Sequence, residues 1–209
     1  MFIAFEGPDN VGKSTSAAVL DMAGQPDYNM TKEGHARNVA DWREAGEQLM
    51  VKTYDRIDWF SHMVYRLALP HKEWNDARPR TVFAMPDTHL VVKLHRPDTA
   101  DFTVAADDES AATDTRTRGV ETPVDIVNST YFYFADFFTG LNEERDYALF
   151  KTVSLIEVVN TKGEPYLQRL ASFSSPVTDW GWVERVYGNR HITDMELLDL
   201  LSHEDAQRL

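Results

Sequence analysis

The sequence predicts one three-layer α/β domain over residues 1–209, in which about five parallel strands are flanked by helices. Two observations lead to this prediction. Short apolar runs of strand length alternate with longer amphipathic segments, which is typical of a mainly parallel sheet covered by helices. The chain also shows no internal repeat and no Gly/Ser-rich linker, and 209 residues are enough for one sizeable core but few for two.

The predicted elements follow from apolar spacing and from the residues that end each run. Strands are expected at 2–5, 28–33, 51–56, 89–95 and 151–159, and helices at 13–24, 38–50, 59–69 and 123–138. A capping box of Thr193 and Glu196 begins another helix in a helical tail at about 178–209. We expect the tail to pack on the core, and the aromatic side chains of the helix at 123–138 to pack on the sheet.

Composition and charge exclude several classes of protein. The formal net charge is −13, and such an acidic surface repels nucleic-acid phosphates and anionic lipids. No apolar run approaches the roughly 20 residues of a membrane span. The N-terminus lacks the pattern of a secretory signal, and the absence of cysteine excludes disulfides and thiolate metal ligands. We therefore expect a soluble, cytoplasmic protein that binds neither nucleic acid nor membranes.

A glycine-rich loop follows the first predicted strand. The segment GPDNVGKS at residues 7–14 matches the phosphate-binding pattern G-x-x-x-x-G-K-[ST] between a strand and a helix. Its two glycines let the backbone wrap with N–H groups pointing inward, and the positive end of the next helix adds attraction. Lys13 is expected to reach the β- and γ-phosphates of ATP, and the Ser14 hydroxyl to ligate Mg²⁺. The predicted ATP phosphate contacts are Gly7, Asn10, Val11, Gly12, Lys13, Ser14 and Thr15.

A charged pair ends the third predicted strand, at the edge where ligands gather in open α/β sheets. Arg56 can clamp a second phosphate through two parallel hydrogen bonds, which a lysine cannot do. Asp55 can hold Mg²⁺ through water. The alternative interpretation is an ordinary surface ion pair.

Four segments resemble the thymidylate kinases. FIAFEGPDNVGKST is similar to their F-I-x-x-E-G-x-D-x-x-G-K-[ST]-T, and YDRIDWFSHMVYR to their D-R-[YH]…S-x-x-x-Y segment, with one extra residue before Ser61. PDTHLVVKLHRPD resembles their P-D-L-x-x-Y-L-D strand, and RTRGVETPVD resembles their arginine-bearing lid and the helix after it. The resemblance implies the nucleotide-kinase fold of P-loop NTPases, a mobile lid at about 107–124 and, by analogy, a homodimer.

The resemblance also assigns an acceptor site residue by residue. Asp9 would hold the 3′-hydroxyl of the acceptor sugar, and Arg56 would hold the acceptor phosphate. Tyr65 would lie under the sugar 2′-position and select deoxyribose. Ser61 marks the helix of this site, and His62 stands where the family has an Asn or Gln that reads the thymine edge.

The chain departs from the family at several places, two of which concern predicted site residues. Relatives carry a second phosphate-neutralising arginine in the phosphate loop or the lid; Asn10 is uncharged, so Arg116 and Arg118 are expected to supply it. The alternative is that these are two solvated loop arginines. The family's base-reading Phe and Arg have no clear counterparts, and Trp42 and Arg43 are the candidate substitutes.

These observations predict a deoxynucleoside monophosphate kinase that transfers the γ-phosphoryl group of MgATP to a thymidylate-like or modified pyrimidine deoxynucleotide. A phosphate dianion is already a nucleophile, so catalysis consists of positioning and of charge neutralisation by Lys13, Mg²⁺ and the arginines. One alternative is a deoxynucleoside kinase, in which an acidic residue acts as base on the sugar 5′-hydroxyl. The other is an ATP-binding switch or interaction module that phosphorylates no metabolite.

Overall fold

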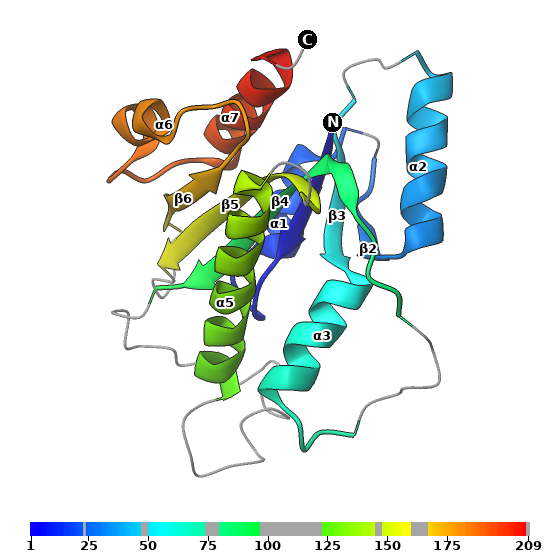
Figure 1. Ribbon diagram of the computed structural model, residues 1–209, viewed down its shortest axis with the longest axis vertical. Helices are drawn as coiled ribbons and strands as arrows, with labels where there is room; N and C mark the ends of the chain where they lie inside the picture. Colours follow the sequence, from blue (N-terminus) through cyan, green and yellow to red (C-terminus); the bar gives the residue numbers. More distant parts are fainter. Residues whose placement is uncertain are drawn as a thin grey trace.

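The computed structural model of the protein describes residues 1–22, 24–46, 50–73, 80–96, 123–144, 148–159 and 167–207. Figure 1 shows the helices and strands along the chain. The strands are β1 (Phe2–Glu6), β2 (Asp27–Met30), β3 (Lys52–Ile57), β4 (Met85–His95), β5 (Phe150–Val159) and β6 (Leu167–Ser174). The helices are α1 (Lys13–Leu20), α2 (Lys32–Glu44), α3 (Asp58–Ala68), α5 (Pro123–Glu143), α6 (Trp180–Tyr187) and α7 (Asp194–Gln207).

The strands form one sheet in the order β2-β3-β1-β4-β5-β6. The first five in this order run parallel, and β6 runs antiparallel to β5. The α/β architecture with about five parallel strands is therefore confirmed, and β6 is an addition that the sequence did not predict. The chain leaves β1 toward β2 and leaves β3 toward β4, in opposite directions. The carboxyl ends of these two neighbours thus form a topological switch point, where open α/β sheets bind ligands.

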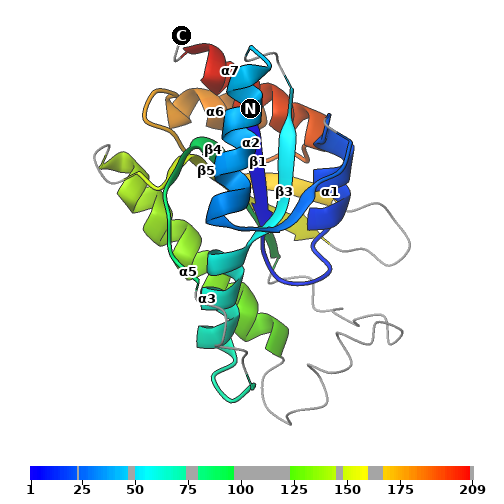
Figure 2. The same ribbon diagram turned by 90° about the vertical axis from the view of Figure 1, so that its right-hand side faces the viewer.

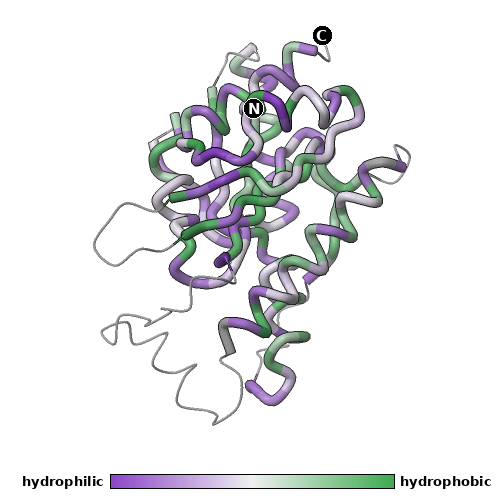
Figure 3. The backbone as a smooth tube through the Cα atoms, turned by 90° about the vertical axis from the view of Figure 1, so that its left-hand side faces the viewer, coloured by the Kyte–Doolittle hydropathy of each residue, from purple (hydrophilic) through white to green (hydrophobic). Residues whose placement is uncertain are grey.

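Alternation along β1 divides the core into two layers. Ile3 and Phe5 belong to the cluster formed with α1 and α7, whereas Phe2 and Ala4 belong to the cluster formed with α3 and α5. Figure 2 shows α1 on one side of the sheet and α3 and α5 on the other. In Figure 3, polar and apolar residues alternate along the long helix α5, as expected for a helix that buries one side.

The segment from β2 to α2 differs from the prediction. The strand expected at 28–33 ends at Met30, because the Thr31 hydroxyl accepts a hydrogen bond from the Gly34 N–H at 3.1 Å and caps α2. The helix expected at 38–50 therefore begins at Lys32. Within β2, Asn29 has a φ of 51°, and only its flanking residues pair with β3.

The C-terminal tail packs on the core, as predicted. Glu196 accepts from the Thr193 N–H at 2.8 Å, and the Thr193 hydroxyl accepts from the Glu196 N–H at 3.2 Å, so the capping box that begins α7 is confirmed. The aromatic residues of α5 form a buried group and an exposed group. Tyr131, Phe134 and Phe138 are buried, whereas Phe132, Tyr133 and Phe137 are exposed. Within the described ranges, no helix combines the length and apolarity needed to cross a membrane.

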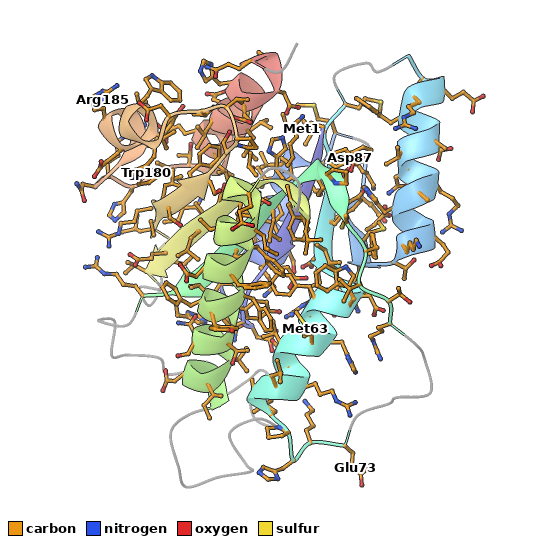
Figure 4. All side chains as sticks on the ribbon, in the orientation of Figure 1. Met1, Met63, Glu73, Asp87, Trp180 and Arg185 are labelled. Carbon is orange, nitrogen blue, oxygen red and sulfur yellow. The ribbon has the colours of Figure 1, made fainter. Side chains whose placement is uncertain are left out.

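A buried histidine joins α2 to the amino end of the sheet. His35 Nδ1 lies 3.0 Å from the Tyr54 hydroxyl, and its Nε2 lies 3.0 Å from Asp87 Oδ1. Figure 4 places Asp87 and Met1 at this end of the sheet, whereas Met63 lies on α3 beyond the other end.

A second buried histidine links β4 and β5 to α7. His89 Nδ1 lies 2.8 Å from the Thr152 hydroxyl, and its Nε2 lies 2.9 Å from Asp205 Oδ1. Complete burial lowers the pKa of His89, and this desolvation outweighs the attraction of Asp205. The imidazole is therefore neutral in the folded protein near pH 7.

We expect the protein to lose stability on mild acidification. Below pH 6.5 the unfolded chain protonates His89 while the folded chain keeps it neutral until its lowered pKa is reached, so acid favours unfolding. A buried neutral histidine such as His89 lowers the free energy of unfolding by up to about 1.4 kcal/mol for each pH unit between pH 6.5 and its lowered pKa. Urea unfolding at pH 7.5 and 5.5 should give a smaller loss for His89→Gln than for the wild type. The exposed control His191→Gln should match the wild type; an equal loss in all three proteins would contradict the prediction.

Candidate functional site

The phosphate loop lies between β1 and α1, against β4. Gly7 and Gly12 have φ angles of 139° and 73°, in the region that favours glycine. A Cβ on Gly7 would stand 2.0 Å from the backbone oxygen of Lys93, so no side chain fits there. The Lys93 ammonium also donates to the Ser16 hydroxyl at 2.6 Å. β4 therefore supports both the start of the loop and the helix that follows it.

The predicted phosphate contacts differ in exposure. Val11 is fully buried in the cluster on the α1 side, so its contribution to ligand binding is limited to its backbone. Asn10, Ser14 and Thr15 have exposed side chains around the loop. Polar groups are thus available beside the inward-facing backbone.

Lys13 is buried within the loop, and its ammonium donates a hydrogen bond to the backbone carbonyl of Pro8. Burial, assisted by the positive charge of Arg56, lowers the pKa of Lys13 to about 7, although nearby carboxylates oppose the shift. An anionic ligand in contact with the ammonium would restore its charged form. The buried ammonium can therefore bind an anionic group at this position.

Ser14 and Asp55 supply the oxygen atoms that a magnesium ion requires. The Ser14 hydroxyl donates to Asp55 Oδ2 at 2.6 Å. The other oxygen, Asp55 Oδ1, is buried and has no hydrogen-bond partner among the residues that the structure describes. Among the described residues there is no cluster of three acidic, His or Cys side chains that could hold a metal ion by themselves. This donor set fits Mg²⁺ completed by phosphate oxygens and water, as is usual for this ion.

Arg56 lies at the end of β3 with its guanidinium buried among polar side chains. Its Nη2 donates to Asp9 Oδ1 at 2.5 Å and to the Tyr65 hydroxyl at 3.5 Å. Its Nη1 donates to the Ser61 hydroxyl at 3.4 Å and to the Tyr131 hydroxyl at 3.3 Å. The backbone φ of Arg56 is 77°, a left-handed conformation that costs about 1–3 kcal/mol unless the surroundings hold it. Hydrogen bonds thus hold the Arg56 guanidinium in place, and the surroundings of Arg56 also hold its backbone in the left-handed conformation.

Glu6 belongs to the same cluster, although the sequence analysis assigned it no role. Its Oε1 accepts from the Ile57 N–H at 2.5 Å, and its Oε2 accepts from the hydroxyls of Ser61 at 2.8 Å and Tyr131 at 3.0 Å. Complete burial raises the pKa of Glu6, opposed by the Arg56 charge and these three donors. The sequence signal was a carboxylate at the end of an apolar strand, directly before the loop.

His95 supports the loop from the end of β4. Its Nε2 lies 2.9 Å from the backbone oxygen of Asp9, which can only accept, so Nε2 carries the proton. Burial lowers the pKa of His95. Asn128 on α5 bonds to both the N–H and the C=O of His95, at 2.9 and 3.1 Å. The histidine therefore connects α5 to the peptide of Asp9.

The structure brings together four of the predicted acceptor residues, namely Asp9, Arg56, Ser61 and Tyr65. His62 follows Ser61 on α3 and is half-buried. The predicted lid arginines, Arg116 and Arg118, lie outside the described residues, as does the lid itself up to residue 122.

The two candidate substitutes for the base-reading residues lie elsewhere. Trp42 packs edge-on against Phe2 at the amino end of β1, with ring centres 5.8 Å apart. Arg43 is exposed in the last turn of α2. Because the phosphate loop follows the other end of β1, the structure does not bring Trp42 and Arg43 together with the other predicted acceptor residues.

An open pocket of about 90 Å³ lies where α2 and α3 begin. Asp58 and Trp59, two of its lining residues, follow Arg56 closely in the chain. The others are Thr31, Lys32, Glu33, Arg80, Thr81 and Phe83. The pocket combines two aromatic rings with charged groups of both signs.

Comparisons with known proteins assign the chain to no family. A scan against family models, a search of curated proteins and a search of solved structures each gave no match to the chain. The functional interpretation therefore rests on the site itself.

We expect Gly7→Ala to destabilise the protein by at least about 3 kcal/mol, because it combines backbone strain with a clash against the Lys93 carbonyl. Gly140→Ala is the matched control: nothing lies within 4 Å of its added Cβ, and the residue is helical. That control should gain about 0.5–1 kcal/mol. Denaturant unfolding of both variants measures the difference, and similar stabilities would refute the close approach of loop and β4.

Proposed function

We propose that the protein is a nucleotide kinase that transfers the γ-phosphoryl group of ATP to the phosphate of a deoxynucleoside monophosphate. The observation that supports this most directly is the pairing of two phosphate-binding cations on neighbouring strands. Lys13 begins α1, directly after the loop that follows β1. Arg56 is the last residue but one of β3, which pairs with β1 through Phe5 and Asp55. Asp9 of the loop contacts Arg56 at 2.5 Å, so the two cationic positions face one site.

Each cation has a separate task in this proposal. The loop N–H groups, Lys13 and the N-terminus of α1 bind the ATP phosphates. Arg56 binds the phosphate of the acceptor with the planar donor set of its guanidinium. An acceptor phosphate held between these groups is aligned for attack on the γ-phosphorus, and no protein base is needed because a phosphate dianion is itself the nucleophile.

Magnesium belongs to this proposal because the donor set at Ser14 and Asp55 fits it. When bound, it neutralises charge that develops on the transferred phosphoryl group. The chain's own contribution is to hold one hydroxyl and one carboxylate 2.6 Å apart at the mouth of the loop. Asp55 also keeps a second oxygen that can orient a metal-bound water.

The acceptor class is proposed from the residues around Arg56. Tyr65 lies 3.5 Å from the guanidinium and presents its ring to it at 5.4 Å, so an aromatic surface adjoins the acceptor phosphate position. Such a surface favours the deoxyribose of a substrate over a sugar with an additional hydroxyl. The pocket with Trp59 and Phe83 is the proposed base site.

The proposed function is tested by a panel of nucleoside and deoxynucleoside monophosphates, scored for the diphosphate product with MgATP. We expect product from at least one deoxynucleotide and none from its nucleoside. Phosphorylation of the nucleoside alone would support a deoxynucleoside kinase. ATP binding with no phosphorylated product from any acceptor would support a switch or interaction module.

We expect Arg56→Lys to lower kcat/KM for the acceptor by at least about 100-fold, because a lysine cannot span the partners of the guanidinium. The affinity for ATP, measured by calorimetry, should change much less, since Lys13 and the loop are untouched. Arg185→Lys, at an exposed position on α6, is the matched control and should behave as the wild type. Retained acceptor turnover in Arg56→Lys would exclude Arg56 from the acceptor site.

A further inference from the structure

The geometry points to Glu6 as the positioning residue that holds Arg56 ready for the acceptor phosphate, an inference that rests on the proposed function. Glu6 is fully buried, so it does not itself meet a substrate. It acts on Arg56 by two separate routes, one through side-chain hydroxyls and one through the backbone.

The first route is fixed by the direction of its hydrogen bonds. The hydroxyls of Ser61 and Tyr131 each have one proton, and both donate it to Glu6 Oε2, at 2.8 and 3.0 Å. They can therefore only accept from Arg56 Nη1, which lies 3.4 and 3.3 Å away. Because a carboxylate accepts and never donates, it turns both hydroxyl lone pairs toward the guanidinium. Without the carboxylate, one of these hydroxyls could turn its proton toward the other, which lies 3.3 Å away.

The second route runs through the peptide after Arg56. Glu6 Oε1 accepts from the Ile57 N–H at 2.5 Å, directly beyond the residue whose φ is 77°. A left-handed conformation at a residue with a side chain persists only where its neighbours hold it. Glu6 thus secures the backbone from which the Arg56 side chain projects.

A second carboxylate, that of Asp9, bonds Arg56 directly and differs from Glu6 in its surroundings. Asp9 bonds Nη2, but its side chain is 43% exposed, so solvent and ligands can compete for it. Glu6 is shielded from solvent and remains with Arg56 whatever occupies the site. The two carboxylates near this guanidinium therefore have different roles. Asp9 is accessible to a ligand, and Glu6 holds Arg56 in place whether or not a ligand is bound.

The test uses Glu6→Gln, which keeps the shape of the side chain and removes its charge. We expect nitrogen-15 NMR of the Arg56 guanidinium to show restricted rotation in the wild type and freer rotation in Glu6→Gln. Arg56→Lys assigns the signal, and the exposed Glu184→Gln is the matched control. This measurement is independent of catalysis. Unchanged Arg56 rotation in folded Glu6→Gln would overturn the inference.

Kinetics give the second readout. Glu6→Gln should raise KM for the acceptor about tenfold to hundredfold, the range for loss of charge-assisted hydrogen bonds, with KM for ATP nearly unchanged. A comparable rise in both KM values would indicate general structural damage and would contradict a positioning role. If wild-type protein phosphorylates no monophosphate, the proposed function fails, and the NMR result still decides whether Glu6 positions Arg56.

Tyr131→Phe serves where Glu6→Gln does not fold, because it removes one hydroxyl link and leaves the carboxylate in place. It should raise the acceptor KM in the same direction but less. If Glu6→Gln folds, adding Tyr131→Phe to it should have little further effect, since both act on one network. Full additivity of the two changes, or no effect of Tyr131→Phe alone, would count against the hydroxyl route.

Discussion

Two buried charged groups, Glu6 and Arg56, which the hydroxyls of Ser61 and Tyr131 link, determine how the carboxyl end of the sheet is built. Burying two charges is costly unless hydrogen bonds satisfy both of them. Here the bonds come from three different elements: the N–H of Ile57 belongs to β3, the hydroxyl of Ser61 to α3, and that of Tyr131 to α5. A shift of any one of these elements would remove one of the three hydrogen bonds to the buried carboxylate. These bonds therefore link the packing of α3 and α5 to the end of β1, where the phosphate loop starts.

The phosphate loop is also held by β4. The Lys93 carbonyl excludes any side chain at Gly7, and the Lys93 ammonium bonds Ser16 on α1. At the end of the same strand, His95 bonds the carbonyl of Asp9. A loop fixed at its beginning, its middle and the helix that follows does not need to be ordered by its ligand. Less conformational entropy is then lost on binding than for a loop that folds around phosphate.

The parts of the site that the sequence predicted are those whose chemistry follows from short spacing. The phosphate loop and the pair at Asp55 and Arg56 each lie within a few consecutive residues, so a local pattern reveals them. Tyr131 is 125 residues from Glu6, and only the packing of α5 against the sheet brings them together. β6 was missed for a related reason: polar Gln168 is buried in it, which breaks the alternation that marks a strand. The local sequence pattern thus identified Lys13 and Arg56, whereas Glu6 and Tyr131, which support Arg56, are brought together only by tertiary packing.

The short strand β2 has a consequence for how molecules of this protein can meet. It is an edge of the sheet, and an edge strand normally exposes a row of free N–H and C=O groups to which another chain can add. The left-handed turn of the backbone at Asn29 interrupts that row after two residues. An incoming strand would find no continuous register along this side. The φ angle of Asn29 therefore disfavours the addition of further strands along the β2 edge, and with it the growth of fibres.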